Sequence, residues 1–243
     1  MSDEVAKLEV RDRSVDLDVL GPTIGQSGVD VRRLRPETHH VTYDPGFGNT
    51  AAARSTITYI SGSEGILLYR GYRIEDVARE CSFLEVAYLL IYGRLPTAPE
   101  LAQWEHDIAH HSLLNEEMRS FFDAFPRRAH PMAVLSSATN AISTFYDVYR
   151  RPTRAAEIDA GARTLIAKLP TVAAWAYKKS IGEPYVYPQV EYSYVENFLR
   201  MMFTTPLEEM TVDPAVVKAL NVLLILHADH EMNCSTSTVR GVG

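Results

Sequence analysis

The densest group of reactive side chains lies in residues 226–240, which read Leu-His-Ala-Asp-His-Glu-Met-Asn-Cys-Ser-Thr-Ser-Thr-Val-Arg. Imidazole, carboxylate, amide, hydroxyl and guanidinium groups occur here directly after an apolar stretch. His227 and His230 are three positions apart, so they share a face if one helix continues through both. Imidazoles at a helix end are suited to bind or polarise an anionic substrate that carries a carbonyl group.

Two other interpretations of this segment are a metal site and a structural role. The order His-x-x-His-Glu differs from the His-Glu-x-x-His and His-x-x-Glu-His motifs of zinc peptidases, and no third ligand is marked elsewhere. We therefore predict no metal site. The structural alternative places His227 and His230 at a buried helix end, where their rings bond backbone carbonyls. The number of polar groups around them favours binding, and a structural role is kept as an alternative for His227.

Three further polar clusters are weaker candidates. Residues 125–132 carry two arginines and a histidine before a predicted helix. This is consistent either with anion binding at a helix N-terminus or with a solvated connector that caps the helix. His106, His110 and His111 are expected on the solvated face of a helix. Residues 43–50 lack the Lys-Ser/Thr ending of a phosphate-binding loop, so we predict a turn there.

The chain that positions these residues is predicted to be mainly helical. Alternating apolar and polar residues from 6 to 19 predict a β-hairpin, and residues 55–60 and 65–70 predict a second one. We therefore expect a small β-rich N-terminal region over residues 1–72. The remaining residues, 73–243, are expected to form a helical region.

Capping and stop signals mark the boundaries of the predicted helices. Thr97 and Glu100 have the spacing of a capping box, as do Ser193 and Glu196. Pro170 is predicted to end one helix before the next begins. No separate closing helix is expected beyond residue 226. The predicted helices cover residues 83–91, 98–111, 132–149, 153–168, 172–179, 197–203 and 215–226.

Composition narrows the class of protein. The 243 residues are 46% hydrophobic and 23% charged, as in soluble globular proteins. The net charge of −7 argues against a nucleic-acid partner, which normally requires a basic stripe. No apolar run approaches the ~20 residues of a membrane-spanning helix, and the polar, acidic start is no secretory signal. Cys81 and Cys234 cannot form a disulfide framework, so we expect a cytoplasmic protein that does not contact a membrane.

Several segments resemble bacterial citrate synthases and occur in that family's order along nearly the whole chain. The resemblance implies a mainly α, multi-helical large domain of the citrate synthase type. It also implies the condensation of acetyl-CoA with oxaloacetate and water to citrate and CoA, with acetyl-CoA as a substrate and no cofactor. The matching segments are residues 43–47, 57–60, 65–72, 87–96, 129–132, 167–170, 196–202 and 225–240.

The resemblance also assigns roles to single residues. It implies that His230 and Asn233 bind oxaloacetate, and that His227 and Ser235 support them. The family's enol-stabilising histidine and catalytic aspartate are expected beyond Gly243, together with the carboxylate-binding arginines and the small CoA-binding domain. A buried dianion without its arginines is costly to desolvate. We therefore expect an apparently truncated chain that has no catalytic residue of its own and is inactive alone.

A regulatory site is implied by the NADH-inhibited branch of the family. Two positions depart from that branch, because Thr164 stands where it has arginine and Val190 where it has asparagine. We therefore expect weak inhibition by NADH or none. The residues that match the allosteric site are His111, Tyr146, Lys168 and Thr205.

Two alternative functions remain. 2-Methylcitrate synthase shares these motifs and takes propionyl-CoA, although the extended β-rich N-terminus favours citrate synthase. The other is a non-catalytic, truncated paralogue that pairs with a full-length partner. Subunits of the family associate through long helices, so we expect a homodimer or hexamer. The apolar stretches at residues 134–149 and 165–177 are the candidate surfaces.

Overall fold

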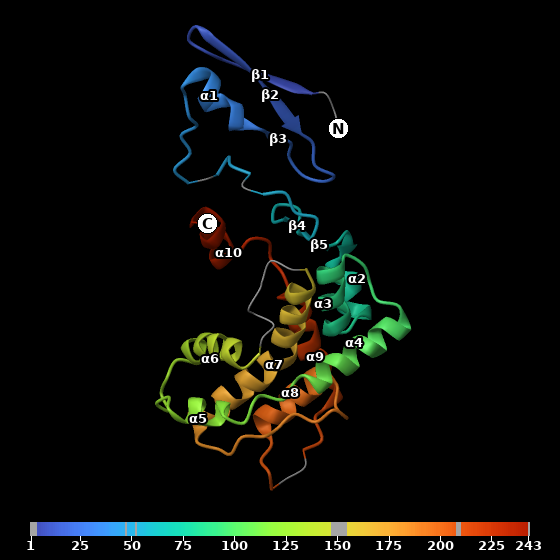
Figure 1. Cartoon of the computed structure of the whole chain (residues 1–243). Coiled ribbons are helices and arrows are strands. Elements are labelled where there is room, and N and C mark those ends of the chain that lie inside the picture. Colours follow the sequence, from blue (N-terminus) through green and yellow to red (C-terminus); the bar gives the residue numbers. More distant parts are fainter. Residues whose placement is uncertain (1–3, 47, 52, 147–154, 208–209, 243) are drawn as a thin grey trace.

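The structure is a computed structural model that describes residues 4–46, 48–51, 53–146, 155–207 and 210–242. Figure 1 shows a small β-rich part at the N-terminal end and a larger body of helices. The prediction of a mainly α chain with a β-rich N-terminal region is therefore confirmed. None of the described helices is both long enough and apolar enough to cross a membrane.

The first sheet contains the predicted N-terminal hairpin. Leu17 and Val15 of the hairpin are buried against Leu34 of a short helix, and together they form a small separate core. The sequence did not predict this helix, α1, or the 3₁₀ helix η1 before it. The elements are β1 (Val5–Val10), β2 (Arg13–Leu20), β3 (Gly28–Val29), η1 (Val31–Arg33) and α1 (Leu34–Thr38).

The second sheet contains the second predicted hairpin and one further strand. Its strands are antiparallel, with Thr58 opposite Tyr69 and Ser61 opposite Ile66. Tyr69 is fully buried and packs with apolar side chains of the helices that follow, Ile225 among them. This sheet therefore joins the helical body. Its strands are β4 (Thr58–Ser61), β5 (Ile66–Tyr69) and β6 (Tyr72–Arg73).

Of the next three helices, the second and third begin and end close to the predicted positions, and the first had no predicted bounds. The capping box of Thr97 and Glu100 is present, with the Glu100 carboxylate accepting the Thr97 amide at 2.8 Å. Gly93 ends α3 in the left-handed region, at φ 82°, where a glycine is favoured. The helices are α2 (Ile74–Glu80), α3 (Phe83–Tyr92) and α4 (Ala98–His110).

The central core lies between α5 (Met118–Asp123), α6 (Pro131–Phe145) and α7 (Ala155–Ile181). Helix α5 was not predicted. Helix α6 is shorter than predicted, because Tyr146 is already extended, and the predicted residues 147–149 lie outside the described part of the chain.

The apolar stretches at residues 134–149 and 165–177 were the candidate surfaces for subunit association. The structure instead buries much of both stretches inside the chain. Ile142 and Trp175, one from each stretch, are fully buried in the same core. These side chains pack against each other's helices, so they are not available to a partner. The buried side chains of the two stretches are therefore excluded as a surface for association, while association through their other residues stays a prediction.

Pro170 lies inside α7, so the prediction that it ends a helix was wrong. Proline has no amide hydrogen, and the carbonyl four residues earlier, that of Ile166, therefore loses its helical donor. The hydroxyl of Tyr194 donates to this carbonyl oxygen at 2.9 Å. A side chain from another helix replaces the missing hydrogen bond, and α7 continues.

The last three helices are α8 (Tyr194–Phe203), α9 (Pro214–Leu226) and α10 (Cys234–Val242). The side chain of Ser193 caps α8, as the sequence indicated, and that of Asp213 caps α9. Helix α8 begins three residues earlier than predicted. Helix α10 contradicts the expectation that no separate helix follows residue 226.

Candidate functional site

The reactive segment begins where α9 ends. His227 is the C-terminal cap of this helix, and its ring Nδ1 lies 2.7 Å from the Leu223 carbonyl oxygen. The chain then leaves the helix, so the condition for a shared helical face, one helix that continues through His227 and His230, is not met. Both histidines are exposed, and the alternative of a buried helix end is therefore wrong. The His227 ring nevertheless bonds a backbone carbonyl, as the structural alternative required.

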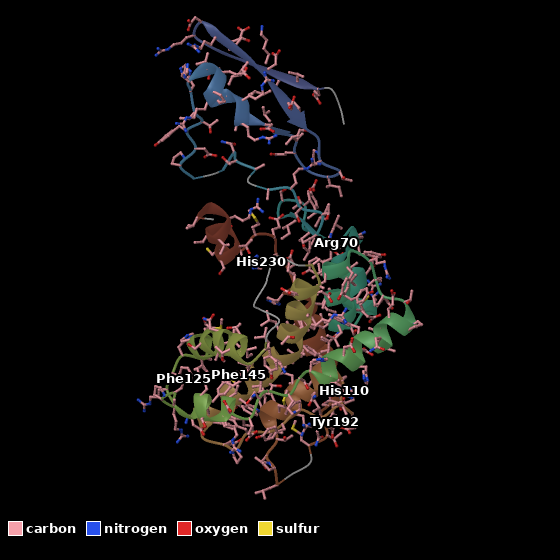
Figure 2. The ribbon with its side chains drawn as sticks, in the orientation of Figure 1. Arg70, His110, Phe125, Phe145, Tyr192 and His230 are labelled. Atoms are coloured by element: carbon pink, nitrogen blue, oxygen red, sulfur yellow. The ribbon has the colours of Figure 1, made fainter. Side chains whose placement is uncertain are left out.

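His230 lies in the turn between α9 and α10 (Figure 2). The next residue, Glu231, has φ 70°, in the left-handed region that residues other than glycine seldom adopt. The turn is therefore an uncommon backbone conformation that other contacts must stabilise. Those contacts come from the second sheet, more than 150 residues earlier in the chain.

The buried hydroxyl of Tyr69 contacts the end of α9 and the start of the turn. It lies 3.1 Å from the carbonyl oxygen of Ile225 and 3.0 Å from that of Asp229. It also accepts the amide of Asp229 at 3.3 Å. Burial raises the pKa of the Tyr69 hydroxyl, which therefore stays protonated and able to donate.

The carboxylate of Asp229 accepts one hydrogen bond from the second sheet and one from the turn itself. It accepts the hydroxyl of Thr58 in β4, and its Oδ2 accepts the amide of Glu231 at 3.3 Å. Asp229 and Glu231 are the two neighbours of His230. The residue that carries the imidazole is therefore flanked by two fixed points.

Asn233 and Ser235 lie at the start of α10, on the same exposed stretch as His230. The Oδ1 of Asn233 accepts the amide of Thr236 at 2.9 Å, so this oxygen already caps the helix. The amide NH₂ is then the part of Asn233 that suits an anionic ligand. The four predicted residues lie together within nine positions, but no contact between their side chains defines a closed pocket in the described part of the chain.

The catalytic groups of the family were predicted to follow this segment. Helix α10 ends at Val242, and Gly243 lies outside the described residues. The enol-stabilising histidine and the catalytic aspartate were expected beyond Gly243, so their location stays a prediction. Within the described residues the candidate site consists of groups that suit binding.

The β4–β5 hairpin is itself fixed to the helical body by Arg70. Its Nε and Nη2 lie 3.2 and 2.6 Å from the Leu90 carbonyl oxygen near the end of α3, and Nη1 lies 2.8 Å from the Thr56 hydroxyl. A cation at a helix C-terminus is favourable because the last carbonyls have no helical donor. Arg70 is therefore engaged within the protein.

No role was predicted from the sequence for Thr58, Tyr69 or Asp229. Thr58 and Tyr69 belong to two of the segments that resemble the family, at residues 57–60 and 65–72. That resemblance marked the segments without showing what their side chains contact. These contacts join residues that are far apart in the sequence, and they exist because the fold places β4 and β5 against the end of α9.

The predicted regulatory residues are brought together only in part. Lys168 is buried, and its Nζ donates to the carbonyls of His111 at 2.7 Å and Leu113 at 2.6 Å. It also lies 4.4 Å from the centroid of the Tyr146 ring. Burial lowers the pKa of Lys168 to about 8.

Thr205 lies apart from Lys168, Tyr146 and His111. It follows Thr204, whose carbonyl accepts Lys178 at 2.6 Å. Lys178 is ten residues beyond Lys168 on α7, which corresponds to about 15 Å along a helix. Thr205 therefore lies near a different part of α7.

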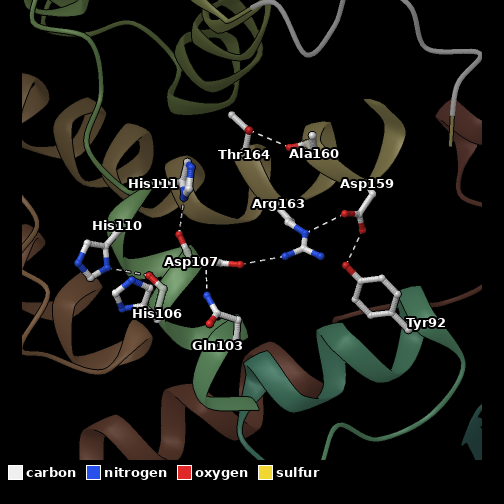
Figure 3. A network of polar contacts seen from close by, with 10 residues as sticks. All are labelled: Tyr92, Gln103, His106, Asp107, His110, His111, Asp159, Ala160, Arg163 and Thr164. Atoms are coloured by element: carbon white, nitrogen blue, oxygen red, sulfur yellow. Dashed lines mark hydrogen bonds and ion pairs between the residues drawn. The ribbon is translucent and has the colours of Figure 1, made fainter. Parts of the chain in front are cut away.

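A polar network lies close to these residues and joins α3, α4 and α7 (Figure 3). Arg163 contacts Asp107 at 3.0 Å and Asp159 at 2.9 Å. Tyr92 donates to Asp159 at 2.5 Å, and burial, the main cause, raises its pKa to about 12. Thr164, one of the departures from the NADH-inhibited branch, donates to its own helix at Ala160.

The predicted solvated histidines are exposed, as expected. The rings of His106 and His110 are in contact in a tilted arrangement, with 3.8 Å between their centroids, and His110 Nδ1 lies 2.8 Å from the His106 carbonyl oxygen. His111 is exposed and caps α4. Among the described residues, no group of three or more histidine, cysteine, aspartate or glutamate side chains is arranged to hold a metal ion.

Residues 125–132 form the capping connector that the sequence analysis offered as one alternative. His130 Nδ1 accepts the amide of Met132 at 3.2 Å at the start of α6. Arg127 donates to the carbonyl of Ile181 at 2.7 Å, at the end of α7. These side chains are engaged within the protein, and the anion-binding alternative has no contact in its favour among the residues that the structure describes.

A cavity of about 270 Å³ lies between α4, α7 and α8. His110, Val190, Tyr192 and Asn197 are among the residues that line it. None of the residues from 226 to 242 contributes to its lining, so the cavity is separate from the His230 segment.

The comparisons with known proteins agree on one family. The family model described as "Citrate synthase, C-terminal domain" matches residues 46–243. "Citrate synthase 1" of Mycobacterium tuberculosis, from strains CDC 1551 / Oshkosh and ATCC 25618 / H37Rv, is 50% identical over 242 residues. The match covers 100% of this chain and 56% of each relative. The chain therefore spans little more than half the length of these curated relatives.

Solved structures give the same result. Citrate synthases from Pyrobaculum aerophilum and Thermotoga maritima MSB8 match with TM-scores of 0.71 and 0.66, at 32% and 27% identity. These matches cover 82% and 81% of this chain, and 51% and 49% of the solved chains. The third is a ternary complex of carboxymethyl coenzyme A and oxaloacetate with citrate synthase from Thermoplasma acidophilum. It matches with a TM-score of 0.70 at 25% identity, over 79% of this chain and 49% of that one.

Proposed function

Because the chain belongs to the citrate synthase family, we propose that its natural-length polypeptide condenses acetyl-CoA with oxaloacetate and water to give citrate and CoA. Members of this family are acyltransferases. The observation that carries the proposal is the exposed turn of His230, fixed on both sides by contacts to Tyr69 and Thr58. The related structure that contains oxaloacetate and a CoA derivative supports the substrate class.

In this proposal His230 donates an N–H hydrogen bond to an oxygen of oxaloacetate. Among the described residues, the exposed imidazole has no hydrogen-bond partner that would hold it away from a ligand. The NH₂ of Asn233 adds a second donor, because its Oδ1 is used by the cap of α10. Ser235 lies on the first turn of α10, and His227 closes α9, so both support the binding segment.

These groups bind and orient, and they do not supply the whole reaction. Oxaloacetate carries two carboxylates, and their desolvation requires cationic partners. We propose that the arginines, the enol-stabilising histidine, the catalytic aspartate and the small CoA-binding domain belong to the further length that the relatives have. The 243 residues alone are then expected to be inactive, because catalytic groups that act together fail together.

We further propose a cytoplasmic homodimer or hexamer that needs no cofactor. Apolar side chains on α9 and α10 are exposed in this chain, with Leu223 51% exposed and Val239 71% exposed. They support the proposal because another polypeptide surface would bury them. The apolar residues buried between α6 and α7 are excluded from that surface because they already form the core. Light scattering of the natural-length polypeptide gives the number of subunits.

The test is an assay of CoA release by the natural-length polypeptide with acetyl-CoA and oxaloacetate. We expect His230→Gln to lower kcat/KM by about 100-fold, as when one strong charge-assisted hydrogen bond is lost. His106→Gln is the matched control, because this exposed histidine lies on α4 outside the segment.

Three outcomes would contradict the proposal. Wild-type protein that releases no CoA would refute the activity. Higher kcat/KM with propionyl-CoA than with acetyl-CoA would instead assign 2-methylcitrate synthase. Equal activity of His230→Gln and His106→Gln would remove His230 from the site.

A further inference from the structure

We propose that Asp229 is a positioning residue that fixes the orientation of His230 through its bonds to Thr58 and Tyr69. The inference rests on the proposed binding of oxaloacetate by His230, and it assigns to the β4–β5 hairpin a part in substrate affinity. Thr58, Tyr69 and Asp229 are not themselves expected to touch the substrate.

The backbone of Asp229 is fixed first. The Tyr69 hydroxyl contacts both its carbonyl oxygen, at 3.0 Å, and its amide, at 3.3 Å. The same hydroxyl reaches the Ile225 carbonyl at 3.1 Å, in the last turn of α9. One buried oxygen atom thus contacts both the end of α9 and the residue immediately before His230, and it limits how far these two can move apart.

The side chain of Asp229 fixes the other neighbour of His230. Its Oδ2 accepts both the Thr58 hydroxyl and the amide of Glu231. Glu231 has φ 70°, a conformation that needs support from its surroundings. The carboxylate supplies that support. It therefore fixes the backbone on both sides of residue 230.

The hairpin that provides these contacts is rigidly connected to the helical body. Arg70 bonds the Leu90 carbonyl in α3, and the ring of Tyr69 is fully buried among Val86, Leu89 and Ile225. A displacement of His230 would therefore require the carboxylate bonds to break. Prearranged donors bind a ligand more tightly than mobile ones, because less conformational freedom is lost on binding.

The experiment uses Thr58→Val in the natural-length polypeptide, with Thr58→Ser as the conservative variant. Valine has the shape of threonine but lacks the hydroxyl, whereas serine retains it. Thr144→Val is the matched control, because within the described part of the chain the Thr144 hydroxyl bonds its own helix α6, at the Ala141 carbonyl. Asp229→Asn is a second variant that weakens the same bonds.

Two readouts separate positioning from general stability. The first is steady-state kinetics, in which we expect Thr58→Val to raise the KM for oxaloacetate about tenfold while the KM for acetyl-CoA changes less than twofold. The second is the NMR signal of His230 in protein labelled at the histidine ring, assigned by its loss in His230→Gln. We expect this signal to shift or broaden in Thr58→Val and Asp229→Asn, and to be restored in Thr58→Ser.

The outcomes distinguish this inference from the proposed function. An unchanged His230 signal in both Thr58→Val and Asp229→Asn overturns the positioning role, whatever the enzyme does. An unchanged KM for oxaloacetate in an active enzyme overturns it as well. A shifted signal in a protein that neither binds oxaloacetate nor releases CoA supports the positioning of His230 while refuting the proposed function.

Discussion

The hydroxyl of Tyr194 donates to the Ile166 carbonyl oxygen at 2.9 Å, and this is the carbonyl that Pro170 leaves without a helical donor. The bond joins the start of α8 to the middle of α7. It explains how a proline occurs inside a 27-residue helix without ending it. The hydroxyl is well desolvated, which raises its pKa and keeps it in the donating form.

We predict that Tyr194→Phe lowers the free energy of unfolding by about 2 kcal/mol, because it leaves a carbonyl without a donor. In a Pro170→Ala background the new alanine amide can donate to Ile166, so the same substitution should cost about 1 kcal/mol less. Urea unfolding of the four proteins in this double-mutant cycle measures the coupling. Equal costs in both backgrounds would show that the hydroxyl does not compensate for the proline.

Lys168 is predicted to make stability depend on pH. Its pKa is lowered to about 8 by burial, whereas an unfolded lysine titrates near ~10.4. Between these values the unfolded chain binds more protons than the folded one, so the contribution of Lys168 to stability rises with pH. The difference in unfolding free energy between wild type and Lys168→Met should therefore increase from about pH 7.5, below the folded pKa, to about pH 10, just below the unfolded pKa.

The check is urea unfolding of wild type and Lys168→Met across this range. Lys179→Met serves as the control, since Lys179 is a lysine of the same helix with a partly exposed side chain near Asp123. A difference that stays constant or decreases with pH for Lys168→Met would contradict the assigned pKa.

Inhibition by NADH is expected to be weak or absent. Val190 lines the cavity beside His110 with an apolar side chain, and the Thr164 hydroxyl is bonded within its own helix to Ala160. Neither residue offers a donor to an anionic nucleotide, and Thr205 lies away from Lys168. Titration of NADH into the natural-length polypeptide, followed by nucleotide fluorescence, tests this, and a submicromolar Kd would disprove it.

Local signals in the sequence were enough to predict most single elements. Alternation placed the first hairpin, and the capping box of Thr97 and Glu100 placed the start of α4, whereas the Ser193 cap was recognised although its helix begins three residues earlier than predicted. Each of these signals acts within a few residues, so it is readable without the fold. The density of polar groups marked the segment of His230, and the family resemblance added roles for its residues, although its detailed geometry could not be read from the spacing.

The incorrect predictions depend on contacts between distant residues. Pro170 does not end its helix because Tyr194, 24 positions later, supplies a donor. Whether one helix continues through His227 and His230, which the sequence left open, is likewise decided at a distance, because the chain at Asp229 is bonded to the second sheet. Spacing along the chain carries no information about such partners, since the pairing is decided by tertiary packing.

The bond between Thr58 and Asp229 joins residues 171 positions apart. Bringing two such points together costs conformational entropy that only the docked hairpin and helices can offset. We therefore expect the turn of His230 to acquire its shape late in folding, after α3 and α9 have enclosed Tyr69. Under the proposed function, a newly made chain would present its binding segment only once its interior is complete, which would couple ligand affinity to the quality of the fold.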